Sequence, residues 1–387
     1  MSIFGAVLPP SAVPDQRKGN RMSNRITNVV RLACAIALLG ALTTAPPAWS
    51  LSIKPESEID GVVRTLTPRP WWARMIDAGT FSYMDSFTHP EHERTLQITW
   101  GCPSSADCDA ETPGFPFAPA AVIAGVRWND NPPFELTQTS MKECAGRTIA
   151  LPNFSECWGL IFKDGKKRAQ QGEVLDLKSG SVIMLRSHFG DLQFLHAMAS
   201  TAQEKAGQTR DKLLMWAEFT WRAALGEYPG GMKIGETGVP ALQDYFRSGE
   251  TLQTLFTRGN PTHRKNIGSV AFGSLLHMLH DSFTRSHTDR AESDGSTCGA
   301  GLPQRPGRVR QFLNYALQKS SKHAVEDSRD AVHLQLQIIS PNMVDIGQYL
   351  KARLEQKASW DEVKPLLSCV FEVEDAQALT GPGNYGM

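Results

Sequence analysis

The pattern of hydrophobic and polar positions predicts a protein built mainly from α-helices. Apolar residues recur at three- and four-residue steps through residues 208–227, which is the period of an amphipathic helix. The members of this stripe are Leu213, Leu214, Ala217, Trp221 and Leu225. Residues 268–283 are almost entirely apolar, and a helix that is apolar on every side belongs in the centre of a fold. The expected architecture is a bundle of several helices around this central one.

Further helices are expected on both sides of these two segments. Residues 71–79 follow Pro70, and residues 89–102 carry Pro90 near their opening, a position that proline favours in helices. The remaining predicted helices span residues 308–339 and 343–360.

The segment 101–172 is rich in proline, glycine, asparagine and cysteine. Such residues interrupt regular structure, so we expect an irregular insertion that disulfide bonds hold together. Short strands are expected within it, and the apolar stretch 120–128 is one of them.

The first residues have the layout of a secretory signal peptide. Arginines precede an apolar run, residues 32–42, and small residues and prolines follow it. The run is shorter than the ~20 apolar residues that span a bilayer. We therefore expect residues 1–50 to be a signal peptide cleaved near 48–50, and residues 51–387 to form a single domain. An uncleaved N-terminal anchor is the alternative.

Charge and cysteine content narrow the classes of function. Forty Lys and Arg residues balance forty Asp and Glu residues, so the chain has no general basic field for nucleic acid. Removal of Cys34 with the signal peptide leaves an even number of cysteines, which in an exported chain indicates disulfides. The sequence alone does not decide the pairing. Proximity suggests Cys102–Cys108, Cys144–Cys157 and Cys298–Cys369.

The predicted central helix carries ionisable side chains in the stretch SLLHMLHDSFTRSH, residues 274–287. His277 and Asp281 are four residues apart and share a helix face, so both can reach one metal ion. His287 can return to the same place only if the helix breaks around 284–286. Buried ionisable groups without partners are costly, and a metal ion would supply the missing partner.

Other parts of the chain offer supporting residues. His323 and Asp327 are again four apart on a predicted helix, and His188 stands at a polar break ahead of an apolar helix. Any one of these histidines is most simply an ordinary core or surface residue. Taken together, the ordered set predicts a metal centre.

The motif His277-x3-Asp281-x5-His287 resembles that of the zinc-dependent bacterial phospholipase C family. This family belongs to a superfamily with the single-strand-specific nucleases of fungi and plants, whose all-α members hydrolyse phosphoesters at a three-zinc site. SHFGD at 187–191 is similar to the phospholipase segment that carries an upstream zinc histidine. The resemblance covers about residues 180–330.

Softer similarities point to one branch of the family. The stretches RWNDNP and HDSFTRSHTDR resemble a larger branch from pseudomonads and legionellae that hydrolyses phosphatidylcholine. His323-x3-Asp327 is similar to the family's later ligand pair, although an aspartate at the second position is the choice of the nucleases.

The resemblance implies a ligand set for two to three zinc ions. One ion would be held by His188, His277 and Asp281. A second would be held by His287, His323 and Asp327. Asp281 would bridge to a third ion, where His92 would replace a family histidine. The family also uses the amine of an N-terminal tryptophan there, and cleavage after Ala48 would expose Trp49.

The family also has a general-base aspartate upstream of the first zinc histidine. Asp130 and Asp176 compete for this role, and we favour Asp130 because it stands among aromatic, amide and proline residues. The predicted catalytic residues are therefore Asp130 and the bridging Asp281.

The resemblance implies a zinc phosphodiesterase, and the predicted signal peptide implies that it is exported, to the periplasm or outside the cell. Its expected substrate is a phospholipid at a membrane surface, reached by peripheral contact, and nucleic acid is not expected. A single-strand-specific nuclease is the nearest alternative. More distant ones are an HD-type phosphohydrolase using the doublet His280–Asp281, and a non-catalytic binding protein.

Overall fold

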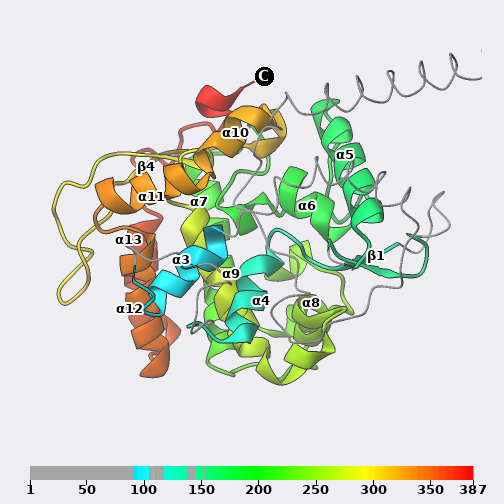
Figure 1. The fold of residues 1–387 in the computed structure, drawn as a ribbon, viewed down its shortest axis with the longest axis horizontal. Coiled ribbons are helices and arrows are strands. Elements are labelled where there is room, and N and C mark those ends of the chain that lie inside the picture. Colours follow the sequence, from blue (N-terminus) through cyan, green and yellow to red (C-terminus); the bar gives the residue numbers. More distant parts are fainter. Residues whose placement is uncertain (1–90, 104–107, 109–116, 137–143, 152, 387) are drawn as a thin grey trace, which may run out of the picture. The chain divides into compact units, whose positions relative to one another are not determined.

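The computed structural model describes residues 91–103, 108, 117–136, 144–151 and 153–386, all within one compact unit, Pro47–Met387. The prediction of a mainly helical fold is confirmed (Figure 1). The predicted signal peptide and the predicted helix at 71–79 lie outside the described residues. None of the helices in the described residues is long and apolar enough to cross a lipid bilayer.

The elements follow one another from α3 to α13, with two short antiparallel strand pairs between helices. The helices are α3 (Glu91–Thr99), α4 (Ala120–Trp128), α5 (Ser155–Gln170), α6 (Ile183–Phe189), α7 (Ala206–Ala224), α8 (Leu252–Thr257), α9 (Ile267–Asp281), α10 (Ser320–Glu326), α11 (Arg329–Ile338), α12 (Met343–Glu355) and α13 (Trp360–Val370). The antiparallel strand pairs are β1 (Phe134–Glu135) with β2 (Thr148–Ile149), and β3 (Thr288–Arg290) with β4 (Val309–Phe312).

Helix α9 is the central helix that its apolar sequence predicts. It packs against α4 on one side and α7 on another, and α3 contacts both α4 and α9. Figure 1 shows α12 and α13 on one side of this group and α5 and α6 on the other. Every residue of α9 is buried except Gly268 and Ser269 at its start, so its polar side chains lie inside the protein.

The strand prediction for residues 120–128 is wrong, because these residues form helix α4. A short apolar run is compatible with either a buried strand or a buried helix, because neither leaves a polar face. Nearly all of this run is buried. The segment 101–172 also contains α5, and the Cys144–Cys157 disulfide ties that helix to the chain before it.

The predicted helix at 308–339 is only partly present. Its first residues form strand β4, which pairs with β3 from the chain just beyond α9. Helices α10 and α11 occupy the remainder, with a break at Asp327 and Ser328. Pairing with a distant strand overrides a local apolar pattern that by itself suits either structure.

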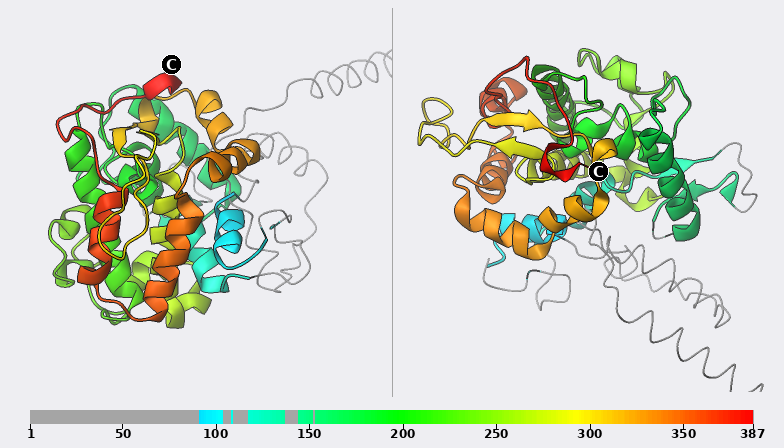
Figure 2. Two further views of the ribbon diagram at one scale, coloured as in Figure 1. Left: turned by 90° about the vertical axis from the view of Figure 1, so that its left-hand side faces the viewer. Right: turned by 90° about the horizontal axis from the view of Figure 1, so that it is seen from above.

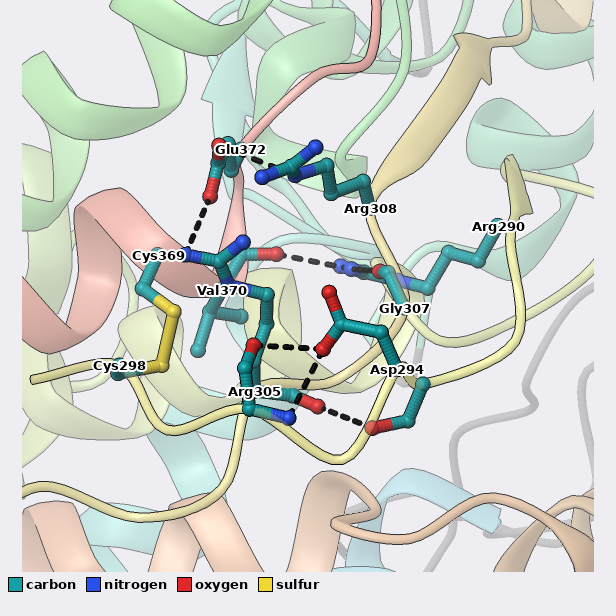
Figure 3. The surroundings of a disulfide bond; sticks show 11 residues. Arg290, Asp294, Cys298, Arg305, Gly307, Arg308, Cys369, Val370 and Glu372 are labelled. Atoms are coloured by element: carbon teal, nitrogen blue, oxygen red, sulfur yellow. Dashed lines mark hydrogen bonds and ion pairs between the residues drawn. A yellow bond between two sulfur atoms is a disulfide. The ribbon is translucent and has the colours of Figure 1, made fainter.

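The three suggested disulfides are all confirmed, with Cys102–Cys108, Cys144–Cys157 and Cys298–Cys369 bonded. Such bonds persist in oxidising compartments, so they indicate a non-cytoplasmic environment. Figure 3 shows Cys298–Cys369 beside Arg290, which reaches toward Gly307 and Val370. The guanidinium of Arg290 donates to the carbonyls of both residues, at 2.9 and 2.8 Å.

Candidate metal centre

Three groups of buried histidine and aspartate residues lie in the interior, and each can hold a metal ion. Within each group the offered ligand atoms lie within 4.8 Å of one another. The groups are His92, His277 and Asp281; Asp130, His188 and His196; and His287, His323 and Asp327. All seven residues that the sequence predicts as ligands, and the predicted base Asp130, therefore belong to these groups.

Helix α9 positions His277 and Asp281 as their four-residue spacing predicts. Nε2 of His277 lies 3.0 Å from Oδ2 of Asp281. On its other edge, Nδ1 of His277 donates to the carbonyl of Val126 in α4, at 2.6 Å. A carbonyl oxygen only accepts, so the proton of the neutral ring sits on Nδ1 and Nε2 keeps a lone pair for a metal.

The same arrangement recurs at other histidines of the centre. Nδ1 of His188 lies 2.9 Å from the carbonyl of Met184, and Nδ1 of His287 lies 2.7 Å from the carbonyl of His196. In both rings Nε2 has no hydrogen-bond partner among the described residues. Metal-binding histidines characteristically use one ring nitrogen for a carbonyl or carboxylate and the other for the ion.

His196 is a candidate ligand that the sequence did not predict. Its Nε2 donates to the carbonyl of Asn129 at 3.1 Å, which leaves the Nδ1 lone pair facing inward. That Nδ1 lies 3.0 Å from Nε2 of His277 and 3.0 Å from Oδ2 of Asp281. The three acceptor atoms thus form a triangle in which each pair is 3.0 Å apart. Acceptors in such contact repel one another unless a cation or a shared proton lies between them.

This triangle differs from the expected ligand partition. The resemblance grouped His188 with His277 and Asp281, but His196 occupies that place and His188 lies with Asp130 and His196. The chain turns at Gly190 after α6 and enters a short 3₁₀ helix, Gln193–His196, which carries His196 inward. Its only sequence signal is a second histidine eight residues after His188, and the end of α6 at Phe189 separates the two.

His287 reaches the centre because α9 stops early. The helix ends at Asp281, somewhat before the expected break at 284–286. The hydroxyl of Ser282 donates to the carbonyl of Leu279 at 2.7 Å, and that of Thr288 donates to the carbonyl of Ser282 at 2.7 Å. Side chains thus satisfy carbonyls that the ended helix leaves free.

The third group is completed by α10. His323 lies within this helix and Asp327 is its C-cap residue. Nε2 of His323 lies 2.9 Å from Oδ2 of Asp327, and Nε2 of His287 lies 3.7 Å from Oδ1 of Asp327. The hydroxyl of Ser286 donates to that same Oδ1 at 2.8 Å.

The charges of the centre depend on one another. Burial alone would lower the pKa of His277, but the carboxylates of Asp281 and Asp130 raise it to about 9. Burial opposes ionisation of Asp281 as well, yet His287, His277 and His92 hold its pKa well below the ordinary value. In the absence of a metal ion, a proton on His277 would offset the negative charge of these carboxylates.

Asp130 and Asp176, the two candidates for the base, lie in different surroundings. Asp130 is buried directly after α4, with Oδ1 at 3.8 Å from Nε2 of His277 and Oδ2 at 4.0 Å from Nε2 of His92. Burial raises its pKa well above the usual value. Asp176 instead accepts from the backbone of Ser179 in a turn, at 2.7 Å, and belongs to none of the three groups.

His280 is buried beside the centre but belongs to none of its groups. Its Nδ1 lies 3.3 Å from Nδ1 of His92, on the side of that ring away from Asp281. Asp281 is instead contacted by His277, one helical turn earlier. This arrangement gives no support to chelation by the adjacent pair His280–Asp281.

Comparison of the chain with family models, with curated proteins and with solved structures finds no match in any of the three. What the centre can bind therefore follows from its donor atoms. These are imidazole nitrogens and carboxylate oxygens, a set that suits zinc and other divalent transition-metal ions. All six cysteines of the described part are in disulfides, so thiolates take no part.

Proposed function

We propose that the protein is an exported zinc-dependent phosphodiesterase of the phospholipase C type. It would hydrolyse the glycerol-side phosphodiester of phosphatidylcholine-like lipids to diacylglycerol and a phosphorylated head group. The ordered resemblance from His188 to Asp327 suggests this chemistry, and the three buried groups of possible ligands support it.

The observation that carries the proposal is the triangle of acceptors formed by His196, His277 and Asp281. The second ring nitrogen of each of these histidines donates to a backbone carbonyl, so both rings are oriented for an ion. Two ring nitrogens of the neighbouring groups, Nε2 of His188 and Nε2 of His287, have no hydrogen-bond partner within the described residues. Buried polar atoms rarely stay unpaired, and bound cations would use both.

The side chains divide the work as follows. When bound, zinc ions would neutralise the charge of a phosphodiester and make water more acidic. Asp281 ties the groups together, because Oδ2 faces His196 and His277 while Oδ1 lies 3.3 Å from Nε2 of His92 and 3.7 Å from Nδ1 of His287. Asp130 accepts the proton of the attacking water at Oδ2, and its raised pKa makes it a stronger base than an exposed aspartate.

A phospholipid is favoured over a nucleic acid as substrate by charge. The chain has a net charge of zero, whereas proteins that bind nucleic acid usually present excess lysine and arginine. The disulfides and the predicted signal peptide are consistent with action outside the cytoplasm, at a membrane surface.

A zinc count and a substrate panel test the proposal together. The purified chain should contain two to three zinc ions and release phosphocholine from phosphatidylcholine vesicles. A chelator should abolish the release, and added zinc should restore it. His333→Ala is a matched control, because His333 is exposed on α11 and belongs to none of the groups. Cleavage of single-stranded DNA without phosphocholine release would favour the nuclease, and full activity without bound metal would overturn the proposal.

A further inference from the structure

Gln318 is a buried glutamine between the third metal group and the segment 381–386. It directly follows the 3₁₀ turn Tyr315–Leu317 and precedes α10, and its exposed fraction is 0%. An amide in such a place is costly unless its hydrogen bonds are made. Its partners therefore show what the residue does.

The neighbours of Gln318 fix the orientation of its amide. Nε2 donates to the carbonyl of Ser286 at 2.8 Å and to the carbonyl of Pro382 at 3.2 Å. Both partners can only accept, so the NH₂ end must face them and Oε1 must point the other way. Nδ1 of His323 lies 2.5 Å from that Oε1. When Nε2 of His323 binds a metal ion beside Asp327, the ring proton must sit on Nδ1, and this acceptor is placed to receive it.

We propose that Gln318 is a positioning residue that fixes His323 as an Nε2 metal ligand; this inference rests on the metal-dependent function proposed above. With its proton on Nδ1, His323 directs the Nε2 lone pair toward Asp327, 2.9 Å away. Gln318 also holds the backbone of Ser286, whose hydroxyl orients Asp327 at 2.8 Å. One amide thus orients two of the three ligands of this group.

The same amide links the group to the segment 381–386. This segment runs along the chain that leads into α10, where the backbone of Lys319 donates to the carbonyl of Tyr385 at 2.8 Å. Both views in Figure 2 show the end of the chain beside α10. The amine of Lys322 adds a hydrogen bond to the carbonyl of Gly386 at 2.9 Å. Displacement of the segment would remove one of the two carbonyls that orient Gln318.

The test compares Gln318→Met with Gln335→Met in the full chain, by titration with zinc alone. Methionine keeps the volume of glutamine but removes both ends of the amide. We expect Gln318→Met to weaken the affinity for one zinc ion by about 10–100-fold, the effect of losing a partner that orients a ligand. The affinity of the remaining ions should stay unchanged. Gln335 is equally buried, and its side-chain atoms lack hydrogen-bond partners in the described part of the chain, so Gln335→Met should bind zinc like the wild type.

A second measurement needs no substitution of Gln318. Nitrogen-15 NMR of the zinc-loaded wild-type protein reports which nitrogen of His323 carries the proton, with His323→Gln used to assign the signal. An Nδ1-protonated ring is expected. An Nε2-protonated ring, or unchanged zinc affinity in Gln318→Met, would overturn the inference while leaving the proposed function standing. Absence of any zinc binding by the wild type would instead refute the proposed function.

Discussion

Gly125 in α4 and Gly273 in α9 face each other, with no side chain between the two helices. A methyl group at Gly125 would overlap the carbonyl oxygen of Val270 and lie 2.9 Å from Cα of Gly273. A methyl group at Gly273 would lie 2.7 Å from Cα of Gly125. This close approach brings the carbonyl of Val126 to His277. The tautomer of a predicted metal ligand therefore depends on a contact between two glycines.

Replacing either glycine by alanine should force α4 and α9 apart. Overpacking of a tight interior costs about 1–3 kcal/mol, and here the obstacle is backbone, which cannot rotate away. We expect Gly125→Ala and Gly273→Ala to lower the free energy of unfolding by at least this amount and to weaken zinc binding, because Val126 moves from His277. Urea unfolding and zinc titration measure both effects.

Gly231→Ala is the control for these two substitutions. A methyl group at Gly231 would meet no atom within 4 Å. Its stability and zinc affinity should therefore match those of the wild type. If Gly125→Ala were as stable as Gly231→Ala, the close packing of α4 on α9 would not be essential to the centre.

Spacing within one helix was enough to predict part of the centre. His277 with Asp281, and His323 with Asp327, each lie one helical turn apart, and the structure brings both pairs together. A period of 3.6 residues is a local property, so a sequence displays it directly. The central position of α9 follows in the same way from its uninterrupted apolar residues.

What the sequence could not predict depends on contacts between distant segments. His196 becomes a ligand candidate only because Asn129, 67 positions away in the chain, turns its ring with a backbone carbonyl. No periodic pattern encodes that contact. Gln318 carries no sequence signal for a similar reason, since its amide is oriented by Ser286 and Pro382.

His277 and His280 should respond very differently to replacement by alanine. His277→Ala removes one corner of the acceptor triangle, so we expect loss of a zinc ion and of nearly all activity. His280→Ala removes only a neighbour of His92, so zinc content should be retained and much of the activity with it. Zinc analysis and phosphocholine release measure the two effects. Equal losses in both variants would favour the HD-type pair.

His280 should make the zinc-free protein sensitive to acid. Burial lowers its pKa to about 3, whereas the ordinary value is 6.5. At a pH below 6.5, His280 is protonated in the unfolded chain but stays neutral in the folded chain. The stability contributed by neutral His280 is therefore complete above that pH and is lost as the pH falls toward the folded-state pKa.

The comparison with His280→Gln isolates this effect, because glutamine does not titrate. Between pH 7 and pH 5 the zinc-free wild type should lose roughly 2 kcal/mol more of its unfolding free energy than His280→Gln does. Chemical unfolding of both proteins at both pH values, with chelator present, gives the four free energies of unfolding that the comparison needs. A parallel loss in the two proteins would mean that His280 is protonated in the folded state.

Arg290 connects the end of α9 to the loop between β3 and β4, which carries Cys298 of the Cys298–Cys369 disulfide. Its Nε donates to the carbonyl of Ser282 at 2.6 Å, and its Nη1 donates to the carbonyls of Gly307 and Val370. Burial lowers the pKa of Arg290 to about 9. The three carbonyls accept hydrogen bonds from the guanidinium and so stabilise its charge. Ser282 adjoins Asp281, which faces histidines of the candidate metal groups on both of its oxygens.

Arg290→Met would remove the guanidinium donor from the carbonyls of Gly307 and Val370, and one of the two donors from that of Ser282, while keeping much of the side-chain volume. Each buried polar group left unpaired costs about 1–3 kcal/mol, so we expect a large fall in the free energy of unfolding and a smaller loss of zinc affinity as the end of α9 loosens. Arg308→Met is the control, because Arg308 lies in the same loop with 44% of its side chain exposed and pairs with Glu372 at 3.1 Å. Surface ion pairs contribute little, so this control should change stability by less than about 1 kcal/mol. Equal stability of the two variants would show that the loop and α9 are not coupled through Arg290.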